Sequence, residues 1–225
     1  MAQVEGILGQ LVDRMIRRSV RTRFRKVYWL PPEKIDAPTI FVPNHHGWYD
    51  GYLMYHALTA LNAPFKDWIT EYDAFPLFGK VGGMPFPAAD AGRRMATIKK
   101  TIRLMKEEHL NLLLFAEQHL HRGPQILPLG GALDLLVRKV PDCKVVPVAI
   151  RYDMSLHERP EVYLKFGSAV KGHEDIQLKT RLAILNEMDQ LETKLRIDPE
   201  AFRVLATGTL DVNERWDMRR LLHKK

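Results

Sequence analysis

One short stretch near the start of the chain carries the side chains needed to move a proton. Residues 43–50 read Pro-Asn-His-His-Gly-Trp-Tyr-Asp, so that His45 and Asp50 are separated by four residues. A carboxylate that turns back onto one imidazole nitrogen fixes the tautomer of the ring and raises the basicity of the other nitrogen. The spacing therefore predicts a general base, His45, with Asp50 as the acid that orients it. The structural alternative is an Asp50 that caps a helix beside a His45 that only completes a turn.

The residues on either side predict how this pair is held. An apolar run, Thr39 to Val42, precedes the stretch, and apolar residues at helical spacing follow it over 51–58. We expect a buried strand, a sharp turn and a helix, which together form a rigid frame for side chains on the loop between them. Asn44 and His45 then lie where the strand ends, and Asp50 lies at the start of the helix.

The rest of the chain alternates between strand and helix patterns. Further strands are predicted at 66–71, 83–87, 112–115, 145–150 and 162–166, and helices at 91–109, 131–139, 178–195, 198–208 and from 213 onward. Such alternation predicts an α/β fold with three αβα layers around a mostly parallel mixed sheet. Ligands of these sheets bind beyond the carboxyl ends of the strands. His45 and Glu117 both follow predicted strands, so they should meet at that edge.

Two of the predicted helices have an apolar stripe that indicates which face is buried. In the helix over 91–109 the stripe is Met95, Ile98, Ile102 and Met105. In the helix over 178–195 it is Leu178, Leu182, Leu185, Met188, Leu191 and Leu195. Both stripes are typical of core packing.

Length and cysteine content narrow the class of protein. A chain of 225 residues with 46% hydrophobic content can bury one sizeable core without disulfide bonds or a structural metal. The single cysteine, Cys143, excludes an intrachain disulfide and a zinc site built on a cysteine pair, and it points to a reducing compartment.

Most of the positive charge belongs to the first 26 residues. This segment has seven basic and two acidic side chains, which gives 7 − 2 = +5 of the formal net charge of +7. The other 199 residues therefore carry only +2. No basic stripe interleaved with aromatic residues runs across the body of the chain, which argues against a nucleic-acid partner.

The basic segment also has apolar residues at helical spacing. They are Val4, Ile7, Leu8, Leu11, Val12, Met15 and Ile16. The apolar run is too short for a membrane span, and a secretory signal would have its charges first. A basic amphipathic helix that lies on an anionic membrane surface fits the pattern, and an ordinary docking helix with solvated arginines is the alternative. We expect residues 1–30 to form this membrane-association segment and residues 31–225 to form the domain that carries the chemistry.

Four blocks of the sequence resemble the glycerolipid (lysophospholipid) acyltransferase family. The first is Asn44-His45-x4-Asp50, and the others are Gly82 to Pro87, Leu114 to Glu117 and Val145 to Ile150. They follow one another in the order and approximate spacing of the family, over roughly residues 39–150. The first and fourth blocks match well, and the second and third match in part.

The resemblance implies the same three-layer fold and an acyl transfer. The family moves an acyl group from a thioester, on coenzyme A or acyl carrier protein, to a hydroxyl of a lipid acceptor, without a metal or another cofactor. It implies His45 as base and Asp50 as its orienting acid. The positions expected to bind substrate are Asn44, Gly83, Phe86, Glu117 and Arg122. From the basic segment, we also expect a protein peripheral to the cytoplasmic face of a membrane.

The sequence departs from the family where a phosphate on the acceptor is usually bound. The arginine expected three residues after Phe86 is Ala89, and the one expected three residues after Glu117 is Leu120. Bidentate recognition of a phosphate depends on such donors. We therefore expect an acceptor hydroxyl on a lipid without a phosphate monoester, with His119 and His121 as neutral hydrogen-bonding groups. Arg93, Arg94 and Arg122 are the nearby arginines that would replace the missing ones.

Two other function classes remain open at this point. His45-His46 and Glu117-x-His119-x-His121 have spacings that metallohydrolases use, so a metal-dependent hydrolase is one alternative. A membrane-peripheral lipid-binding protein without turnover is the other, because the same fold can bind without catalysing.

Overall fold

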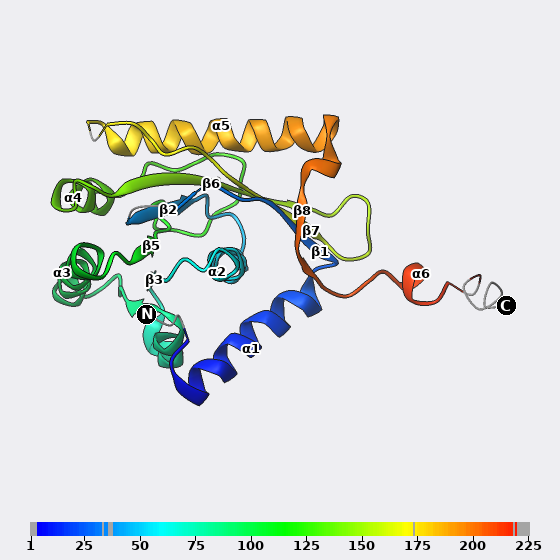
Figure 1. Cartoon of the computed structure of the whole chain (residues 1–225), viewed down its shortest axis with the longest axis horizontal. Coiled ribbons are helices and arrows are strands. Elements are labelled where there is room, and N and C mark those ends of the chain that lie inside the picture. The colour runs from blue at the N-terminus through cyan, green and yellow to red at the C-terminus, as the bar shows by residue number, and fades with distance from the viewer. Residues whose placement is uncertain (1–3, 33, 36–37, 173, 218, 220–225) are drawn as a thin grey trace.

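An eight-stranded mixed sheet organises the computed structural model, which describes residues 4–32, 34–35, 38–172, 174–217 and 219 (Figure 1). The strand order is β4-β3-β5-β2-β6-β7-β1-β8. The strands are β1 Lys26–Leu30, β2 Thr39–Pro43, β3 Phe65–Ile69, β4 Gly83–Pro85, β5 Asn111–Leu113, β6 Lys144–Asp153, β7 Glu161–Phe166 and β8 Arg203–Thr207. Only the pairs β6–β7 and β1–β8 are antiparallel among these strands, which confirms the predicted mostly parallel sheet.

Helices cover both faces of the sheet, as the three-layer prediction requires. The helices are α1 Gly6–Arg23, α2 Asp50–Ala60, α3 Ala91–Glu108, α4 Ala132–Lys139, α5 Ile176–Ile197 and the short α6 Val212–Arg215, with 3₁₀ turns η1 Tyr72–Ala74, η2 Pro76–Val81 and η3 Pro199–Ala201. In Figure 1, α1 and α2 lie on one side of the sheet, and α4 and α5 on the other. The buried side chains agree, because those of α1 and α2 form one hydrophobic cluster and those of α3, α4 and α5 form another.

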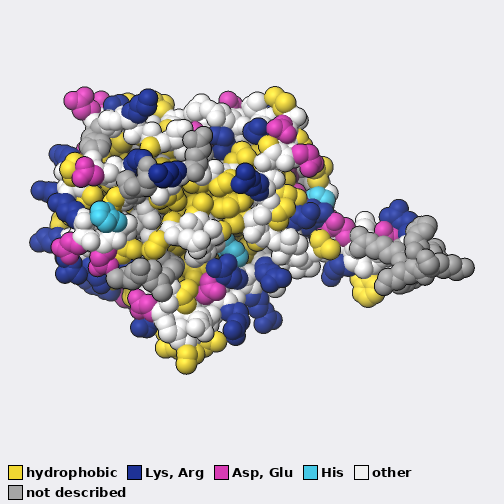
Figure 2. Space-filling view, in the orientation of Figure 1, with side chains coloured by type: hydrophobic (Ala, Val, Ile, Leu, Met, Phe, Trp, Pro, Cys, Tyr) yellow, Lys and Arg dark blue, Asp and Glu magenta, His cyan; other side chains and the backbone are white. Residues whose placement is uncertain are grey.

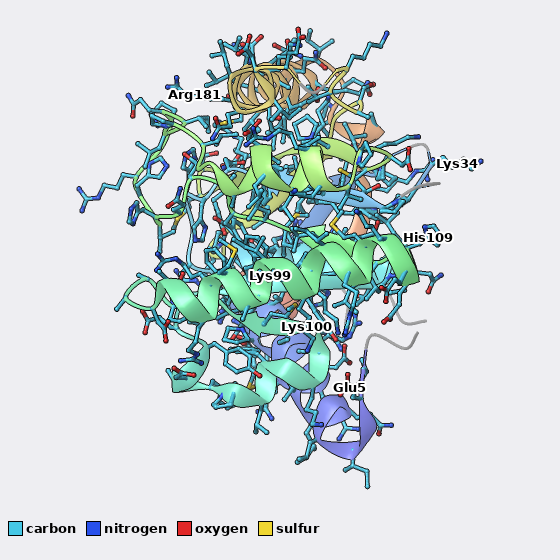
Figure 3. The ribbon with its side chains drawn as sticks, turned by 90° about the vertical axis from the view of Figure 1, so that its left-hand side faces the viewer. Glu5, Lys34, Lys99, Lys100, His109 and Arg181 are labelled. Carbon is cyan, nitrogen blue, oxygen red and sulfur yellow. The ribbon has the colours of Figure 1, made fainter. Side chains whose placement is uncertain are left out.

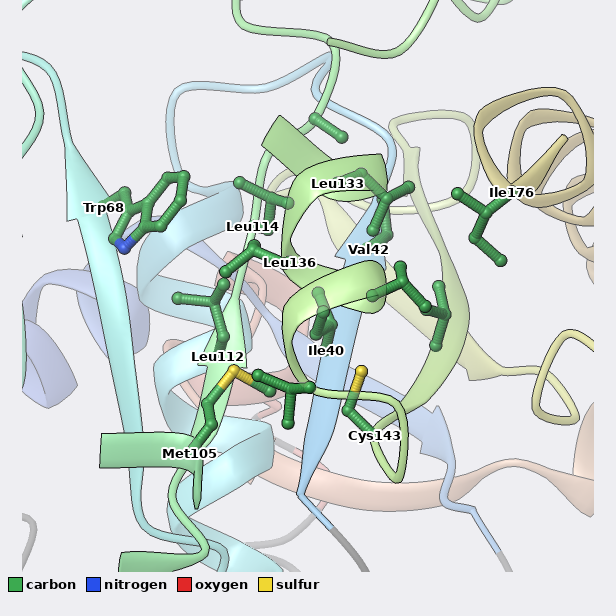
Figure 4. Packing of buried hydrophobic residues seen from close by; sticks show 14 of the residues in the cluster. Ile40, Val42, Trp68, Met105, Leu112, Leu114, Leu133, Leu136, Cys143 and Ile176 are labelled. Atoms are coloured by element: carbon green, nitrogen blue, oxygen red, sulfur yellow. The ribbon is translucent and has the colours of Figure 1, made fainter. Parts of the chain in front are cut away.

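The strand that leads to the predicted base is buried along its whole length. Every residue of β2 is buried, which is typical of a strand covered on both faces. Ile40 and Val42 point toward the cluster of α3, α4 and α5 shown in Figure 4, and Phe41 points toward the cluster of α1 and α2. The apolar run in the sequence is continuous because both faces of β2 need apolar side chains.

Two parts of the chain differ from the secondary structure that their sequence predicts. Residues 26–30, expected to end the amphipathic segment, form β1 within the sheet, beside β7 and β8. The helix expected over 198–208 is wrong, because the chain makes only η3 before β8 pairs antiparallel with β1. Asp198-Pro199 does begin a helical turn, but edge pairing with β1 decides the conformation of the residues that follow. The predicted last helix begins at Val212, and most of its remaining residues lie outside the described part of the chain.

The two apolar stripes predict the buried faces only in part. In α3, Ile98 and Met105 are buried and Lys99 and Lys100 point outward (Figure 3), but Met95 is 44% exposed. In α5 the buried residues are Ile176, Thr180, Ile184, Glu187 and Leu191, whereas Leu178, Leu182 and Leu185 are exposed. The prediction for α5 was wrong because its buried face includes polar residues. The carboxylate of Glu187 is buried against the ammonium of Lys165 on β7. A search for apolar periodicity cannot find a buried face that contains an ion pair.

No helix within the described residues is both long and apolar enough to cross a membrane.

Candidate active site

His45 and Asp50 meet as their spacing predicts. β2 ends at Pro43 and α2 begins at Asp50, and the turn between them brings Nδ1 of His45 to 3.0 Å from Oδ2 of Asp50. A carboxylate only accepts hydrogen bonds, so Nδ1 carries the proton of the neutral ring. The lone pair is then on Nε2. The ring of Phe115 packs against the imidazole, with centroids 4.3 Å apart, and helps to fix its plane.

The carboxylate of Asp50 is fully buried and accepts three hydrogen bonds. Oδ2 accepts from Nδ1 of His45 and from the backbone N–H of Gly47 at 2.9 Å. Oδ1 accepts from the hydroxyl of Tyr152 at 2.5 Å. Burial, and then the charge of Asp50, raises the pKa of Tyr152, so this hydroxyl keeps its proton and donates. These donors hold the carboxylate in one orientation.

The turn needs a glycine at position 47. A Cβ placed on Gly47 would overlap the ring of Tyr152. The aromatic ring can approach the backbone, and its hydroxyl can reach Asp50, only because position 47 has no side chain.

Asn44 fixes the end of β2 to the neighbouring strand. Its Oδ1 accepts from the backbone N–H of Ile150 at 2.7 Å, and its Nδ2 donates to the carbonyl of Ile150 at 3.0 Å. The side chain is fully buried and bonded to β6, beneath the turn. Asn44 was expected to bind substrate, but these contacts give it the geometry of a group that positions His45.

The carboxylate of Glu117 is also occupied by groups of the protein. Its Oε1 accepts from the backbone N–H of His45 at 2.8 Å. Its Oε2 accepts from the backbone N–H of Leu127 and from Nε2 of His121, both at 2.6 Å. Glu117 follows β5, so this buried group ties the loops after β2 and β5 together. The expected substrate-binding residue is therefore placed behind His45, with both oxygens engaged.

Three side chains come close enough to hold a metal ion. Ligand atoms of His46, Glu117 and His121 all lie within 4.8 Å of one another. Each already has protein partners: Nδ1 of His46 accepts from Asn44, and its Nε2 donates to the carbonyl of Gln125. Both nitrogens of His121 face acceptors, the carboxylate of Glu117 and the carbonyl of Arg122. The grouping differs from the one expected, because His45 pairs with Asp50 and His119 is exposed.

A deep cavity of about 790 Å³ opens beside His45, a volume typical of ligand sites. It extends around the carboxyl ends of the strands onto both faces of the sheet. On the side of α3 and α4 its lining includes Trp68, Phe86, Ile98, Leu114 and Leu135. On the side of α1 and α2 its lining includes Ile16, Tyr52, Tyr55, Phe65, Asp67 and Val81. Most of these side chains are apolar, so the cavity suits a hydrocarbon chain.

The remaining predicted binding residues divide between the cavity and the surface. Gly83 and Phe86 line the cavity, and Phe86 stacks on Trp68 with ring centroids 4.3 Å apart. Arg122 is exposed and lies outside the lining of the cavity. Of the arginines near the missing family positions, Arg94 lines the cavity.

Sequence reasoning missed Tyr152. The strand predicted at 145–150 was expected to end at Ile150, but β6 continues to Asp153 and carries Tyr152 to the turn. The alternation of Ile150, Arg151 and Tyr152 was the available signal, because a strand that continues would point Tyr152 to the same face as Ile150.

Comparisons with known proteins place the chain among acyltransferases. A family model described as Acyltransferase matches residues 20–151, which is more than half of the chain. The fold is similar to that of PlsC from Thermotoga maritima, a 1-acyl-sn-glycerophosphate (LPA) acyltransferase, with a TM-score of 0.59 and 17% sequence identity. This likeness covers 83% of the present chain and 80% of that protein. A comparison with curated proteins gave no match.

Proposed function

The chain belongs to the Acyltransferase family, and we propose that it moves a fatty acyl group from a thioester to the hydroxyl of a lipid acceptor with His45 as the general base. The observation that carries the proposal is the hydrogen bond between His45 and the buried Asp50 at the mouth of an apolar cavity. It supplies a base of fixed tautomer next to space for a chain.

The chemistry requires one proton to move twice. Nε2 of His45 takes the proton of the acceptor hydroxyl as its oxygen attacks the carbonyl carbon of the thioester. The imidazolium that forms lies against the charge of Asp50, which stabilises it. The tetrahedral intermediate then expels the thiolate, and His45 returns the proton to sulfur. The products are an ester and a free thiol, and no covalent enzyme intermediate is needed.

The acceptor in this proposal is a lipid alcohol without a phosphate monoester. Ala89 and Leu120 stand where the family usually has arginines. The nearby arginines have other partners: Nη1 of Arg94 donates to the carbonyls of Pro87 and Ala88, and Arg93 forms an ion pair with Asp73 at 2.7 Å. His119 lines the mouth of the cavity and offers a hydrogen-bonding group to an alcohol.

A membrane supplies such an acceptor, and α1 has the surface to dock on one. Its buried residues are Gly9, Val12, Ile16 and Val20. A second apolar row, Ile7, Leu8, Leu11 and Met15, is exposed, with Ile7 at 78%. Figure 2 shows hydrophobic side chains at the tip of the helix and basic ones along it, and Arg14, Arg17, Arg18 and Arg21 line a groove there. The apolar row would insert at the headgroup level, and the arginines would face anionic lipids, which are concentrated in the cytoplasmic leaflet.

An assay of transfer tests the function directly. Purified protein is incubated with acyl-coenzyme A, and separately with acyl carrier protein thioester, in the presence of a total lipid extract. Thiol release that depends on added lipid, together with a new ester in the mass spectrum, is the expected result. Thioester that stays intact with both donors would overturn the proposal and leave a lipid-binding protein without turnover.

A metal-dependent hydrolase is the second candidate, and the grouping of His46, Glu117 and His121 is the observation that favours it. The acyltransferase explains the site better, because these three side chains already have hydrogen-bond partners in the protein, and Glu117 uses one of its oxygens to hold the backbone of His45. Metal analysis separates the two. Stoichiometric metal in purified protein, with hydrolysis lost on chelation, would support the hydrolase.

A further inference from the structure

A carboxyl group lies within the apolar cavity, away from the catalytic pair. Asp67 is the central residue of β3, in register with Gly83 of β4 and Leu113 of β5. Its backbone N–H donates to the carbonyl of Gly82 at 3.1 Å. The backbone of Asp67 is thus fixed on both sides by neighbouring strands, which leaves its side chain with one possible face.

That face is the one covered by α1 and α2. Side chains alternate along a strand, so Asp67 points to the same side as Phe65, and Trp68 points to the opposite side. Phe65 belongs to the cluster formed with α1 and α2, whereas Trp68 belongs to the cluster formed with α3 and α4. Asp67 therefore enters the branch of the cavity that Ile16, Tyr52, Tyr55 and Val81 also line.

One oxygen of the Asp67 carboxyl group is buried without a hydrogen-bond partner. Oδ1 is shielded from solvent, and no hydrogen bond reaches it from any residue that the structure describes. Burial raises the pKa of Asp67 to about 8, opposed only by the backbone of Trp68. At neutral pH the group is therefore mostly the neutral acid, which can both donate and accept a hydrogen bond. A buried polar group without a partner destabilises a fold, so an apolar residue would serve a purely structural role better.

We propose that Asp67 selects, as a specificity-determining residue, a substrate whose hydrocarbon chain carries a hydroxyl group. The proposal rests on the acyl transfer proposed above and adds the chemical class of the chain. The hydroxyl would lie in the branch between β3 and α2, where it exchanges hydrogen bonds with the Asp67 carboxyl group. The rest of that branch is aromatic and aliphatic, and it would hold the methylene groups on either side.

Binding measured without turnover tests the proposal independently of the reaction. Palmitate and its monohydroxylated isomers are titrated by calorimetry into the wild type and into Asp67→Leu and Asp67→Asn. For the wild type we expect one hydroxylated isomer to bind about tenfold more tightly than palmitate. Asp67→Leu should remove that preference and bind palmitate at least as well as the wild type does. Asp67→Asn keeps groups that donate and accept, so it should retain most of the preference.

Turnover then identifies which substrate carries the hydroxyl. In one arm the hydroxylated chain is presented as the acyl thioester with a plain lipid alcohol. In the other arm a plain acyl thioester is offered to an acceptor whose own chain is hydroxylated. The preference, expressed as the ratio of kcat/KM values, should appear in one arm and disappear in Asp67→Leu.

The outcomes separate this proposal from the proposed function. Selective binding of a hydroxylated isomer, without acyl transfer from any thioester, would contradict the acyltransferase mechanism and support the role of Asp67. Transfer in which palmitate and all its hydroxylated isomers bind and react equally well, in wild type and Asp67→Leu alike, would overturn the role of Asp67 and keep the mechanism. If Asp67→Leu fails to fold, the binding of palmitate and of its hydroxylated isomers is compared in the wild type and in Asp67→Asn. That comparison still tests the role of Asp67.

Discussion

The backbone N–H of His45 donates a hydrogen bond to the buried carboxylate of Glu117, at 2.8 Å from Oε1. Glu117 comes after β5 and His45 after β2, so one side chain holds the ends of two adjacent parallel strands. The same carboxylate accepts from Leu127 and His121. The position of His45 therefore depends on a residue that lies 72 positions away in the sequence.

Glu117 should behave as a positioning residue. Glu117→Gln keeps one acceptor oxygen but replaces the other with an NH₂ group, which cannot accept from both Leu127 and His121. We expect kcat to fall by roughly tenfold or more, while KM for the lipid acceptor changes little. Steady-state kinetics over a range of acceptor concentrations gives the two values separately. A large rise in KM at unchanged kcat would show instead that Glu117 contacts the acceptor.

His45→Ala should abolish transfer and leave the fold intact. The imidazole is partly exposed at the cavity, so its removal deletes the base with little loss of packing. General-base contributions are about 100-fold to 10,000-fold. Thiol release measures the rate, and circular dichroism checks the fold. Turnover at the wild-type rate would end the assignment of His45 as base.

Asp50→Asn should reduce the rate as well, because an amide can present its NH₂ group to Nδ1 and favour the wrong tautomer. It should also destabilise the protein, since Asp50 accepts from three donors in a buried position. Thermal unfolding and kinetics on the same samples measure both effects. A variant with lowered stability but full activity would show that Asp50 is only structural.

Tyr152→Phe tests the hydrogen bond that holds the carboxylate of Asp50 in place beside His45. It removes the donor to Oδ1 of Asp50 and keeps the ring that packs over Gly47. An unsatisfied buried acceptor costs about 1–3 kcal/mol, and we expect the free energy of unfolding, measured in urea, to fall by that amount.

Gly47→Ala should destabilise the protein more than Tyr152→Phe does, because the Cβ of the alanine overlaps the ring of Tyr152. If Gly47→Ala has wild-type stability and activity, the close approach of Tyr152 is not required.

The exposed apolar row of α1 should bind membranes. Replacing Ile7 and Leu11 together with serine should weaken sedimentation with anionic vesicles severalfold and spare activity on a dispersed substrate, because both side chains are exposed. Binding of the wild type should weaken with salt, since each basic residue contributes about 1 kcal/mol near such a surface.

Gln10→Ser, on the same helix and also exposed, is the matched control for these substitutions. Deleting the helix is a poor test, because Val12, Ile16 and Val20 belong to the core and their loss would unfold the protein. Equal sedimentation of the double variant and the wild type would make α1 a structural helix only.

The stability of the protein should depend on pH through Asp67. Its pKa in the folded chain is raised from an ordinary 3.8 to about 8. Between about pH 4 and pH 8 the folded state therefore keeps a proton that the unfolded state has released, and the free energy of unfolding falls as pH rises. The effect has an upper limit of about 1.4 kcal/mol for each pH unit. Asp67→Leu removes this slope, so its melting temperature should exceed that of the wild type by a margin that grows from pH 5 to pH 8.

Comparing the two proteins at each pH cancels the other titrating groups, which include the buried His56 with a pKa lowered to about 4. A margin that stays constant over the whole range would mean that Asp67 is not protonated in the fold.

Local patterns in the sequence predicted the elements around His45. The strand through Val42, the turn and the start of the helix at Asp50 follow from an apolar run, a cluster of turn residues and helical periodicity, all within 20 residues. The contact of His45 with Asp50 was predictable because four residues of a single turn separate them. The alternation of strands and helices likewise predicted the mostly parallel sheet and its edge as the place of the site.

Contacts between distant segments could not be read from those patterns. Residues 203–207 have no strong strand signal, and they become β8 because β1 offers an edge to pair with. Tyr152 reaches Asp50 because β6 continues for three residues beyond the end of its apolar run at Ile150. The leucine stripe of α5 predicted the wrong buried face, because the face that is buried contains the ion pair of Glu187 with Lys165.

The sequence by itself therefore determined which polar groups meet at the turn after β2 and which layers carry them. Tertiary structure decided what each polar group does. Asn44 and Glu117 turn inward to hold the backbone, because β6 and the loop after β5 present their N–H and C=O groups there. Asp67 looked like one polar residue in an ordinary strand. Only the packing of α1 and α2 over β3 encloses its Oδ1 atom inside a cavity, since burial depends on segments that lie far apart in the chain.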